Sequence, residues 1–314
     1  MIFKGMKHRK TRIIGLLIYG FLIYGLGFML QPIYLEQGYF VSLLISPFCI
    51  GAMAQTVFDP SVKNKWYISW MQAILLTVFV AFTLGFMGVE TAVCLIIGAP
   101  LVFPLLLIGI FGARHFLGTK NGETTLKASA VLLPLLALVA EPYIAYPERW
   151  EVVRSEITLD APIAEVWAQT VEISEIQPEE RIWTFSHMVL GAPQPISAEV
   201  DGNLRDLLWT KGVRFQEAIT ERVENQRLAW RFSFNNPESL QAFDPHISPA
   251  SDMLWVATGF YELSALPDGR THLVLETHYR LRSPFNSYFS LWGELFLNDF
   301  QSSVLAVIEA RVEA

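Results

Sequence analysis

One acidic residue, Glu217, stands among apolar side chains in a position where it could do chemistry. The segment 213–223 alternates apolar and polar residues, which predicts a strand, and Glu217 falls on the face that it shares with Phe215 and Ile219. On an inward face the carboxyl would lose water, its pKa would rise, and it could act as an acid or hydrogen-bond donor. The alternative, which we favour, is an ion pair with a neighbouring arginine at the mouth of a cavity.

Alternation in the neighbouring strands predicts which other side chains share this inward face. Tyr279 and Thr277 lie on it and could offer hydroxyl groups to a ligand, and Tyr279 is a second weak candidate for acid/base work. The predicted ligand-binding residues are Phe215, Glu217, Trp230, Phe232, Thr277, Tyr279, Trp292 and Phe296. They indicate an apolar pocket with a few polar anchors, or else a core that the same side chains simply fill.

The histidines do not predict a metal site. His272 and His278 share the strand face opposite the inward one, and residues six apart on a strand are separated by about 20 Å. Asp244 and His246 lie in a long loop, 235–252, which we interpret as a lid or as an ordinary surface loop. The sequence contains no GxSxG, phosphate-binding loop, HExxH or CxxC motif, so no cofactor is expected.

These residues belong to a predicted C-terminal domain, residues 148–314, in which an antiparallel sheet precedes a long helix. A short amphipathic helix follows the first strand, and apolar residues recur every three or four positions in the last helix. The predicted strands are 150–159, 206–211, 213–223, 227–234, 254–263 and 271–281, and the last helix covers about 287–312. This order of elements is typical of an α+β domain in which the helix closes one face of the sheet.

Residues 1–147 instead predict a membrane domain of five transmembrane helices. The runs are about 13–30, 39–58, 67–87, 91–113 and 126–144. The first four each hold 18 or more uncharged residues, which is enough to cross a hydrocarbon core. The fifth has only 13 uncharged residues after Lys127, so it crosses if Lys127 reaches the interface and is otherwise re-entrant. Gly15, Gly20, Gly25 and Gly27 in the first run predict close helix packing there.

Charge differs between the two halves and predicts an orientation. Residues 1–147 have ten Lys/Arg and five Asp/Glu, whereas residues 148–314 have thirteen and twenty-five, a net charge of −12 that disfavours nucleic-acid binding. Lys and Arg occur at the N-terminus and in every second loop, which places the N-terminus in the cytoplasm. Five crossings then place the C-terminal domain on the extracytoplasmic side of what we expect to be a bacterial inner membrane, and a re-entrant fifth run would leave it in the cytoplasm.

Three segments of the C-terminal domain resemble the START-like, or SRPBCC, superfamily, which includes polyketide cyclase/dehydrase-like proteins. They are the opening ITLDAPIAEVW at 157–167, the central hairpin with GVRFQE at 212–217 and RLAW at 227–230, and the last hairpin with GFYEL at 259–263 and DGRT at 268–271. The resemblance covers roughly residues 150–314. It implies a helix-grip fold whose cavity, between a curved sheet and the terminal helix, takes apolar ligands. It implies no reaction, because the superfamily shares no catalytic motif.

From these patterns we expect a membrane-tethered START-like domain that binds a lipid or another hydrophobic small molecule at the bilayer surface. The bilayer and that molecule are its predicted partners. A first alternative is a cyclase or dehydratase acting on an apolar substrate, with Glu217 or Tyr279 in acid/base roles, although we favour a protein that is not an enzyme. A second alternative is a non-catalytic interaction module with a filled cavity, whose protein partners the sequence does not reveal.

Overall fold

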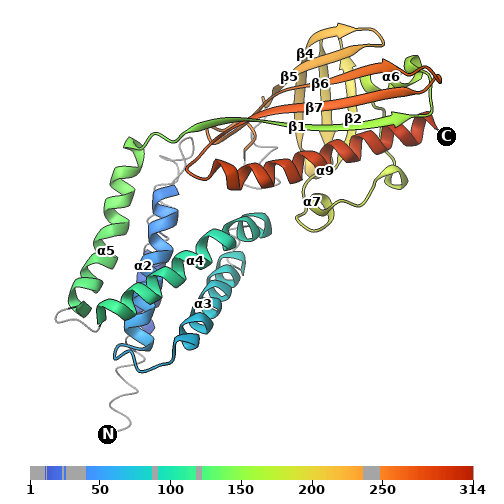
Figure 1. Cartoon of the computed structure of the whole chain (residues 1–314). Helices are drawn as coiled ribbons and strands as arrows, with labels where there is room; N and C mark the ends of the chain where they lie inside the picture. Colours follow the sequence, from blue (N-terminus) through green and yellow to red (C-terminus); the bar gives the residue numbers. More distant parts are fainter. Residues whose placement is uncertain are drawn as a thin grey trace. The chain divides into compact units, whose positions relative to one another are not determined.

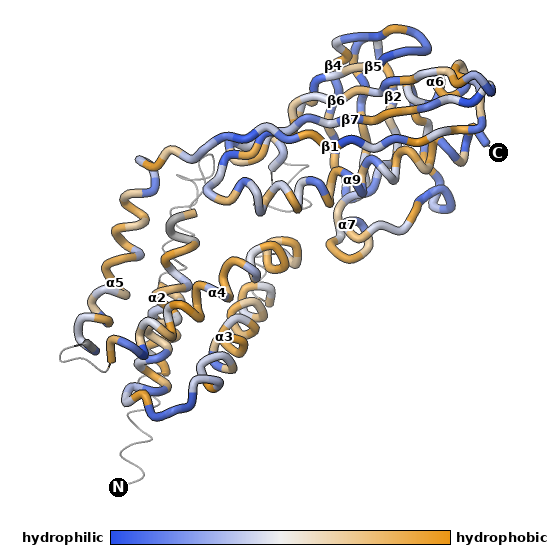
Figure 2. Tube along the Cα trace, in the orientation of Figure 1, coloured by the Kyte–Doolittle hydropathy of each residue, from blue (hydrophilic) through white to orange (hydrophobic). Residues whose placement is uncertain are grey.

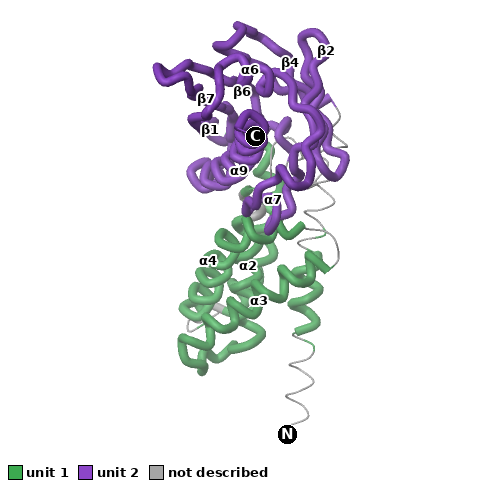
Figure 3. The backbone as a smooth tube through the Cα atoms, turned by 90° about the vertical axis from the view of Figure 1, so that its right-hand side faces the viewer, with its two compact units in different colours: residues 1–145 green, residues 146–314 purple. Residues whose placement is uncertain are grey.

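The computed structural model describes residues 11, 13–22, 25, 40–86, 91–117, 122–235 and 248–313. The chain divides into two compact units, a helical unit of residues 1–145 and a sheet unit of residues 146–314 (Figure 3). The helices of the helical unit are apolar along most of their length, whereas polar and apolar residues are mixed along the sheet unit (Figure 2). The hydropathy of the helical unit therefore suits a lipid environment, and that of the sheet unit suits water.

The helical unit consists of apolar helices, several of which have the length of a membrane span. They are α2 (Phe40–Phe58), α3 (Trp66–Phe86), α4 (Ala92–Leu117) and α5 (Gly122–Ala140), followed by the 3₁₀ turn η1 (Glu141–Tyr143). Within the described residues, three helices are long and apolar enough to cross a membrane: Trp66–Phe86, Ala92–Leu117 and Glu123–Tyr143. Two others, Ile13–Leu22 and Leu44–Phe58, are shorter. The rest of the predicted first span, 13–30, lies largely outside the described residues.

The fifth apolar run is longer as a helix than its uncharged stretch suggested. Helix α5 begins at Gly122, and Lys127 pairs with Glu123 one turn earlier at 2.6 Å. A paired, exposed charge can lie in the interface, so the apolar helix extends from Glu123 through η1 to Tyr143.

Two glycines allow α2 and α4 to pack backbone against backbone. A Cβ atom added at Gly51 would collide with the carbonyl oxygen of Leu106, and one added at Gly109 would collide with that of Phe48. Small residues permit such close approach of membrane helices. At Gly15, Gly20 and Gly25 an added Cβ would meet nothing within 4 Å, so the prediction of close packing at these three positions is wrong, and Gly27 lies outside the described residues.

The sheet unit is a seven-stranded antiparallel sheet with one long helix along a face (Figure 1). Its strands are β1 (Glu148–Leu159), β2 (Pro195–Asp201), β3 (Leu204–Trp209), β4 (Arg214–Val223), β5 (Arg227–Ser233), β6 (Leu254–Ala265) and β7 (Thr271–Arg282). Its helices are α6 (Ile163–Val171), η2 (Pro178–Glu180), α7 (Phe185–Met188), η3 (Thr210–Gly212) and α9 (Asn286–Val312). The strand order is β1-β7-β6-β5-β4-β3-β2, and every neighbouring pair is antiparallel. This is a helix-grip arrangement, and the predicted fold class is confirmed.

Alternation along the strands and the periodicity of α9 create the core. Leu228 and Leu273 of the sheet are fully buried with Ile308 of α9, and α6 adds Val166 to the same cluster. Tight turns keep the strands in register: Asn225 (φ 60°) lies between β4 and β5, and Gly269 (φ 89°) between β6 and β7. The closed core occupies the end of the sheet that faces the C-terminal half of α9.

Candidate functional site

Three phenylalanines form an aromatic face on the inner side of the sheet: Phe215 of β4, Phe232 of β5, and Phe234 just after β5. The ring centroid of Phe215 lies 6.2 Å from that of Phe232 and 5.6 Å from that of Phe234, and Phe232 stacks on Phe234 at 6.1 Å. All three rings remain partly exposed. The same inner face is therefore fully buried at one end, around Leu228, and only partly buried at the end that carries these rings, which also pack against neighbouring core residues.

Aromatic contacts bridge part of the space between the sheet and α9. The ring of Trp209 lies 5.6 Å from that of Phe215 and 5.0 Å from that of Phe300 on α9. A separate hollow, lined by Ile176, Arg181 and Ser303 among others, has a volume of about 10 Å³, room for one water molecule. Aromatic rings therefore fill part of the cavity that was expected from the sequence.

The carboxylate of Glu217 forms an ion pair with Arg205 inside the sheet unit. The two residues are opposite each other in the β3–β4 register, and Arg205 Nη1 donates to Glu217 Oε2 at 2.6 Å. Their side chains are only 2% and 5% exposed. The guanidinium also lies over the rings of Trp230, at 5.4 Å, and Tyr261, at 5.9 Å. Glu217 does pair with an arginine, but deep in the structure instead of at a cavity mouth.

Two hydrogen-bond donors beside this pair have no partner among the described residues. Arg205 Nε and Trp230 Nε1 are both buried, and neither meets an acceptor among the described residues. Trp230 lies against Gly259, where an added Cβ would come within 2.8 Å of the indole. Buried donors without partners are uncommon in proteins. The buried site around Arg205 and Glu217 therefore contains one ion pair and two N–H donors that have no acceptor among the described residues.

Protonation of Glu217 should make the free energy of unfolding depend on pH. Burial raises the pKa of its carboxyl to about 7, against the opposing attraction of Arg205. Since the carboxyl binds its proton more tightly when folded than when unfolded, its contribution to stability is complete below about pH 4.5 and is lost as the pH rises through 7. Wild type should lose stability relative to Glu217→Gln over this interval, as measured by urea unfolding at each pH. Parallel curves for the two proteins would contradict the assignment.

The two hydroxyl groups predicted to meet a ligand are already bonded within the protein. Tyr279 donates to the carbonyl of Ser290 at 3.4 Å and lies against Gly293 of α9. Thr277 Oγ1 accepts a hydrogen bond from Gln301 Nε2 at 3.0 Å. Both side chains are buried and both connect the sheet to α9.

The two helix residues predicted to bind ligand lie away from the centre of the sheet-facing side. Gly293 faces the sheet, because it lies against the ring of Tyr279 on β7. Successive residues of a helix are rotated by about 100°, so Trp292 points toward the outer flank of α9. Trp292 makes its ring contact with Tyr288 one turn earlier, at 6.5 Å. Phe296 lies at the edge and contacts Phe300 at 6.1 Å. The expectation that Trp292 lines the interior is therefore corrected.

The remaining candidates are placed as follows. Asp244 and His246, the predicted lid residues, lie outside the described residues. His278 Nε2 is 2.7 Å from Glu276 on the partly exposed outer side of β7. In the part of the chain that the structure describes, no three His, Cys, Asp or Glu side chains are grouped to hold a metal ion.

One buried cluster was not anticipated from the sequence. His187 of α7 is within 3.1 Å of Ser303 Oγ on α9 and 3.3 Å of the carbonyl of Ala192, and burial lowers its pKa. The backbone amide of Ser186 also donates to Asp299 at 2.7 Å. Because Asp299 contacts this amide and a carbonyl faces the other imidazole nitrogen, the cluster anchors α7 to α9 and lacks the arrangement of a catalytic triad.

Comparison with known proteins adds solved structures only, because no family model and no curated protein matches the sequence. A protein of Nitrosospira multiformis is similar over 52% of this chain and 96% of its own, with 16% identity and a TM-score of 0.32. An uncharacterised protein of Rhizobium leguminosarum covers 54% of this chain and 99% of its own at 15% identity and a TM-score of 0.32. The Aha1 dimer of Colwellia psychrerythraea covers 51% and 96% at 12% identity and a TM-score of 0.29. The fold assignment itself follows from the strand order and the position of α9.

Proposed function

We propose that the sheet unit binds a lipid or another hydrophobic small molecule on the aromatic face, while the N-terminal helices hold it at a membrane. The partial exposure of Phe215, Phe232 and Phe234 carries this proposal, because rings on the inner face of a sheet are ordinarily packed. Each ring that a ligand covers would contribute about 1–3 kcal/mol. The resemblance to START-like proteins supports the same ligand class.

Attachment to the membrane supports this function through concentration. Three apolar helices in the described chain have the length of a membrane span, and the last of them ends at Tyr143, shortly before β1. Molecules dissolved in the bilayer are then presented to the aromatic face at high effective concentration without any additional contact. We place the sheet unit on the extracytoplasmic side, in accord with the Lys/Arg distribution.

The interaction-module alternative has one observation in its favour, and the enzymatic alternative has less. The contact between Trp209 and Phe300 fills part of the interior, as a filled module requires. Glu217 is sealed and paired with Arg205, and Tyr279 is bonded to the backbone, so neither reaches the open face to transfer a proton. Binding at the aromatic face therefore remains the function that the arrangement supports best.

Native mass spectrometry of the detergent-extracted full chain tests the proposal. We expect a bound apolar molecule on wild type, and at least a tenfold weaker retention on Phe232→Ala because the central ring of the aromatic face is removed. Arg231→Ala is the matched control, since Arg231 is the preceding residue of β5 and is exposed on the opposite face. Wild type that is consistently empty, or equal retention by both variants, would favour the interaction module.

A further inference from the structure

An uncharged, exposed segment surrounds α7. The exposed fractions are 66% for Trp183, 60% for Met188 and 50% for Val189. From Ile182 to Leu190 the only titratable side chain is His187, which is buried and has its pKa lowered by burial. Large apolar side chains gathered in one exposed segment indicate a surface that contacts something apolar.

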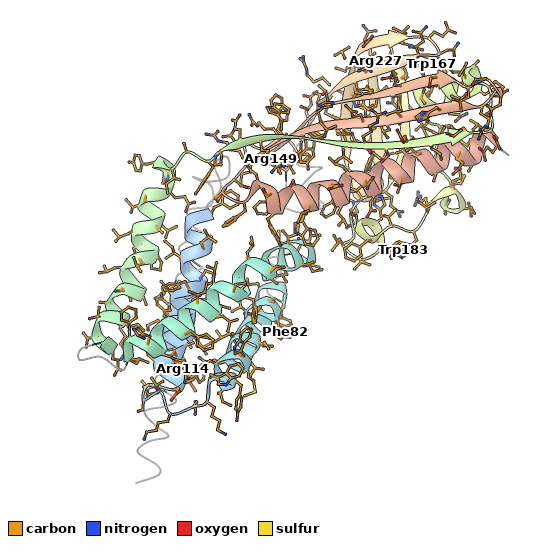
Figure 4. All side chains as sticks on the ribbon, in the orientation of Figure 1. Phe82, Arg114, Arg149, Trp167, Trp183 and Arg227 are labelled. Atoms are coloured by element: carbon orange, nitrogen blue, oxygen red, sulfur yellow. The ribbon has the colours of Figure 1, made fainter. Side chains whose placement is uncertain are left out.

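Helix α9 continues this surface toward the start of the sheet unit. Asp299 and Ser303, which hold α7, lie on the flank of α9 that also carries Trp292 and Tyr288, since all four recur at helical spacing. Leu291, beside this flank, is 64% exposed. Figure 4 shows Trp183 on the side of α9 away from the sheet.

The chain connection identifies what can cover this surface. The apolar helix that ends at Tyr143 is followed by β1 from Glu148, so residues 144–147 limit the distance between the Cα atoms of Tyr143 and Glu148 to roughly 18 Å when fully extended. Asn286 Nδ2 donates to the carbonyl of Pro147 at 2.8 Å, which fixes the first turn of α9 beside this connection. The first turn of α9 therefore lies beside the residues that join the last apolar helix to β1.

We propose that the α7 segment and the outer flank of α9 dock on the lipid bilayer, with Trp183, Met188 and Leu291 in its interfacial layer. Tryptophan, methionine and leucine lose water there, and tryptophan prefers this depth. The docking rests on the membrane attachment in the proposed function and does not require ligand binding. Docking would hold the sheet unit in one orientation relative to the bilayer and would keep the aromatic face close to lipid.

Depth-dependent fluorescence quenching of the full chain in phosphatidylcholine/phosphatidylglycerol vesicles tests this docking. Cys49 and Cys94 are replaced by alanine, and an NBD label is attached to a single cysteine placed by Trp183→Cys or, independently, by Met188→Cys. Lipids carrying a doxyl group near the headgroup should quench these labels at least threefold more than a label at Val223→Cys. Val223 is an exposed apolar residue at the end of β4 and is the matched control.

Two further labels make the outcomes distinguishable. A label at Phe82→Cys, on the exposed side of α3, should be quenched by doxyl groups deep in the acyl chains, and its failure would overturn membrane attachment itself. A label at Trp255→Cys tests a different docking surface, because Trp255 and Trp150 form an exposed aromatic pair on β6 and β1 that could contact lipid in place of the α7 segment. Quenching that is strongest at Trp255, or equal at Trp183, Met188 and Val223, would overturn the docking surface.

Discussion

Replacing Glu217 with leucine should lower the free energy of unfolding at pH 8 by about 3–5 kcal/mol. The substitution leaves the buried Arg205 guanidinium with neither a counter-charge nor an acceptor for its Nη1 hydrogen bond. Urea unfolding of the purified full chain, followed by tryptophan fluorescence, measures the loss. An effect of this size would make Glu217→Leu one of the most damaging single changes in the sheet unit.

A double variant and a control at an exposed ion pair complete this experiment. Arg205→Met combined with Glu217→Leu should recover most of the lost stability, because apolar side chains of similar volume replace the whole buried pair. Glu221→Leu removes one partner of Arg227 at a half-exposed site and should cost less than about 1 kcal/mol. If Glu217→Leu and Glu221→Leu lowered the free energy of unfolding by similar amounts, the buried ion pair would contribute no more to stability than the exposed one.

Gly109→Ala should destabilise the helical unit by about 3 kcal/mol. The added methyl group would overlap the carbonyl oxygen of Phe48, and a backbone atom cannot move aside as the end of a side chain does. Helices α2 and α4 must then separate and lose the close packing around Gly51. The melting temperature of the detergent-solubilised chain should fall accordingly.

Gly112→Ala provides the control in the same helix. A Cβ at Gly112 meets nothing within 4 Å, so alanine should leave the melting temperature unchanged or raise it slightly through its better helix propensity. A fall of equal size for both variants would mean that glycine matters at Gly109 for a reason other than close approach to α2.

Alternation made most strands of the sheet predictable, but one strand was missed. Strands β4, β5, β6 and β7 were predicted close to their observed bounds, as was α9. Strand β2, Pro195–Asp201, was missed although apolar and polar residues alternate from Ile196 to Asp201, because the segment begins with a proline, which is unfavourable within a sheet. It forms because β3 pairs with it and the short bridge at Ile173 borders it, which are contacts that local sequence does not reveal.

The same limit applies to the candidate site. Alternation placed Glu217 on the inner face, where it is 4% exposed, but its partner Arg205 lay just outside the predicted strand 206–211. Helical periodicity found the apolar residues of α9 without showing which of its sides meets the sheet, so Trp292 was assigned inward. Pairing across strands and rotation of a helix about its axis are tertiary properties, and one sequence does not determine them.

The position of β1 has a consequence for how the protein is made. It is the first strand of the sheet unit to be synthesised, yet among the described strands it pairs with the last one alone, β7, from Glu148 against Arg282 to Leu159 against Thr271. Nearly the whole unit must leave the ribosome before this edge can close, and pairings so distant in sequence form slowly. Nascent chains that end before residue 271 should therefore expose β1 as an unpaired edge strand, a state that favours association with other chains.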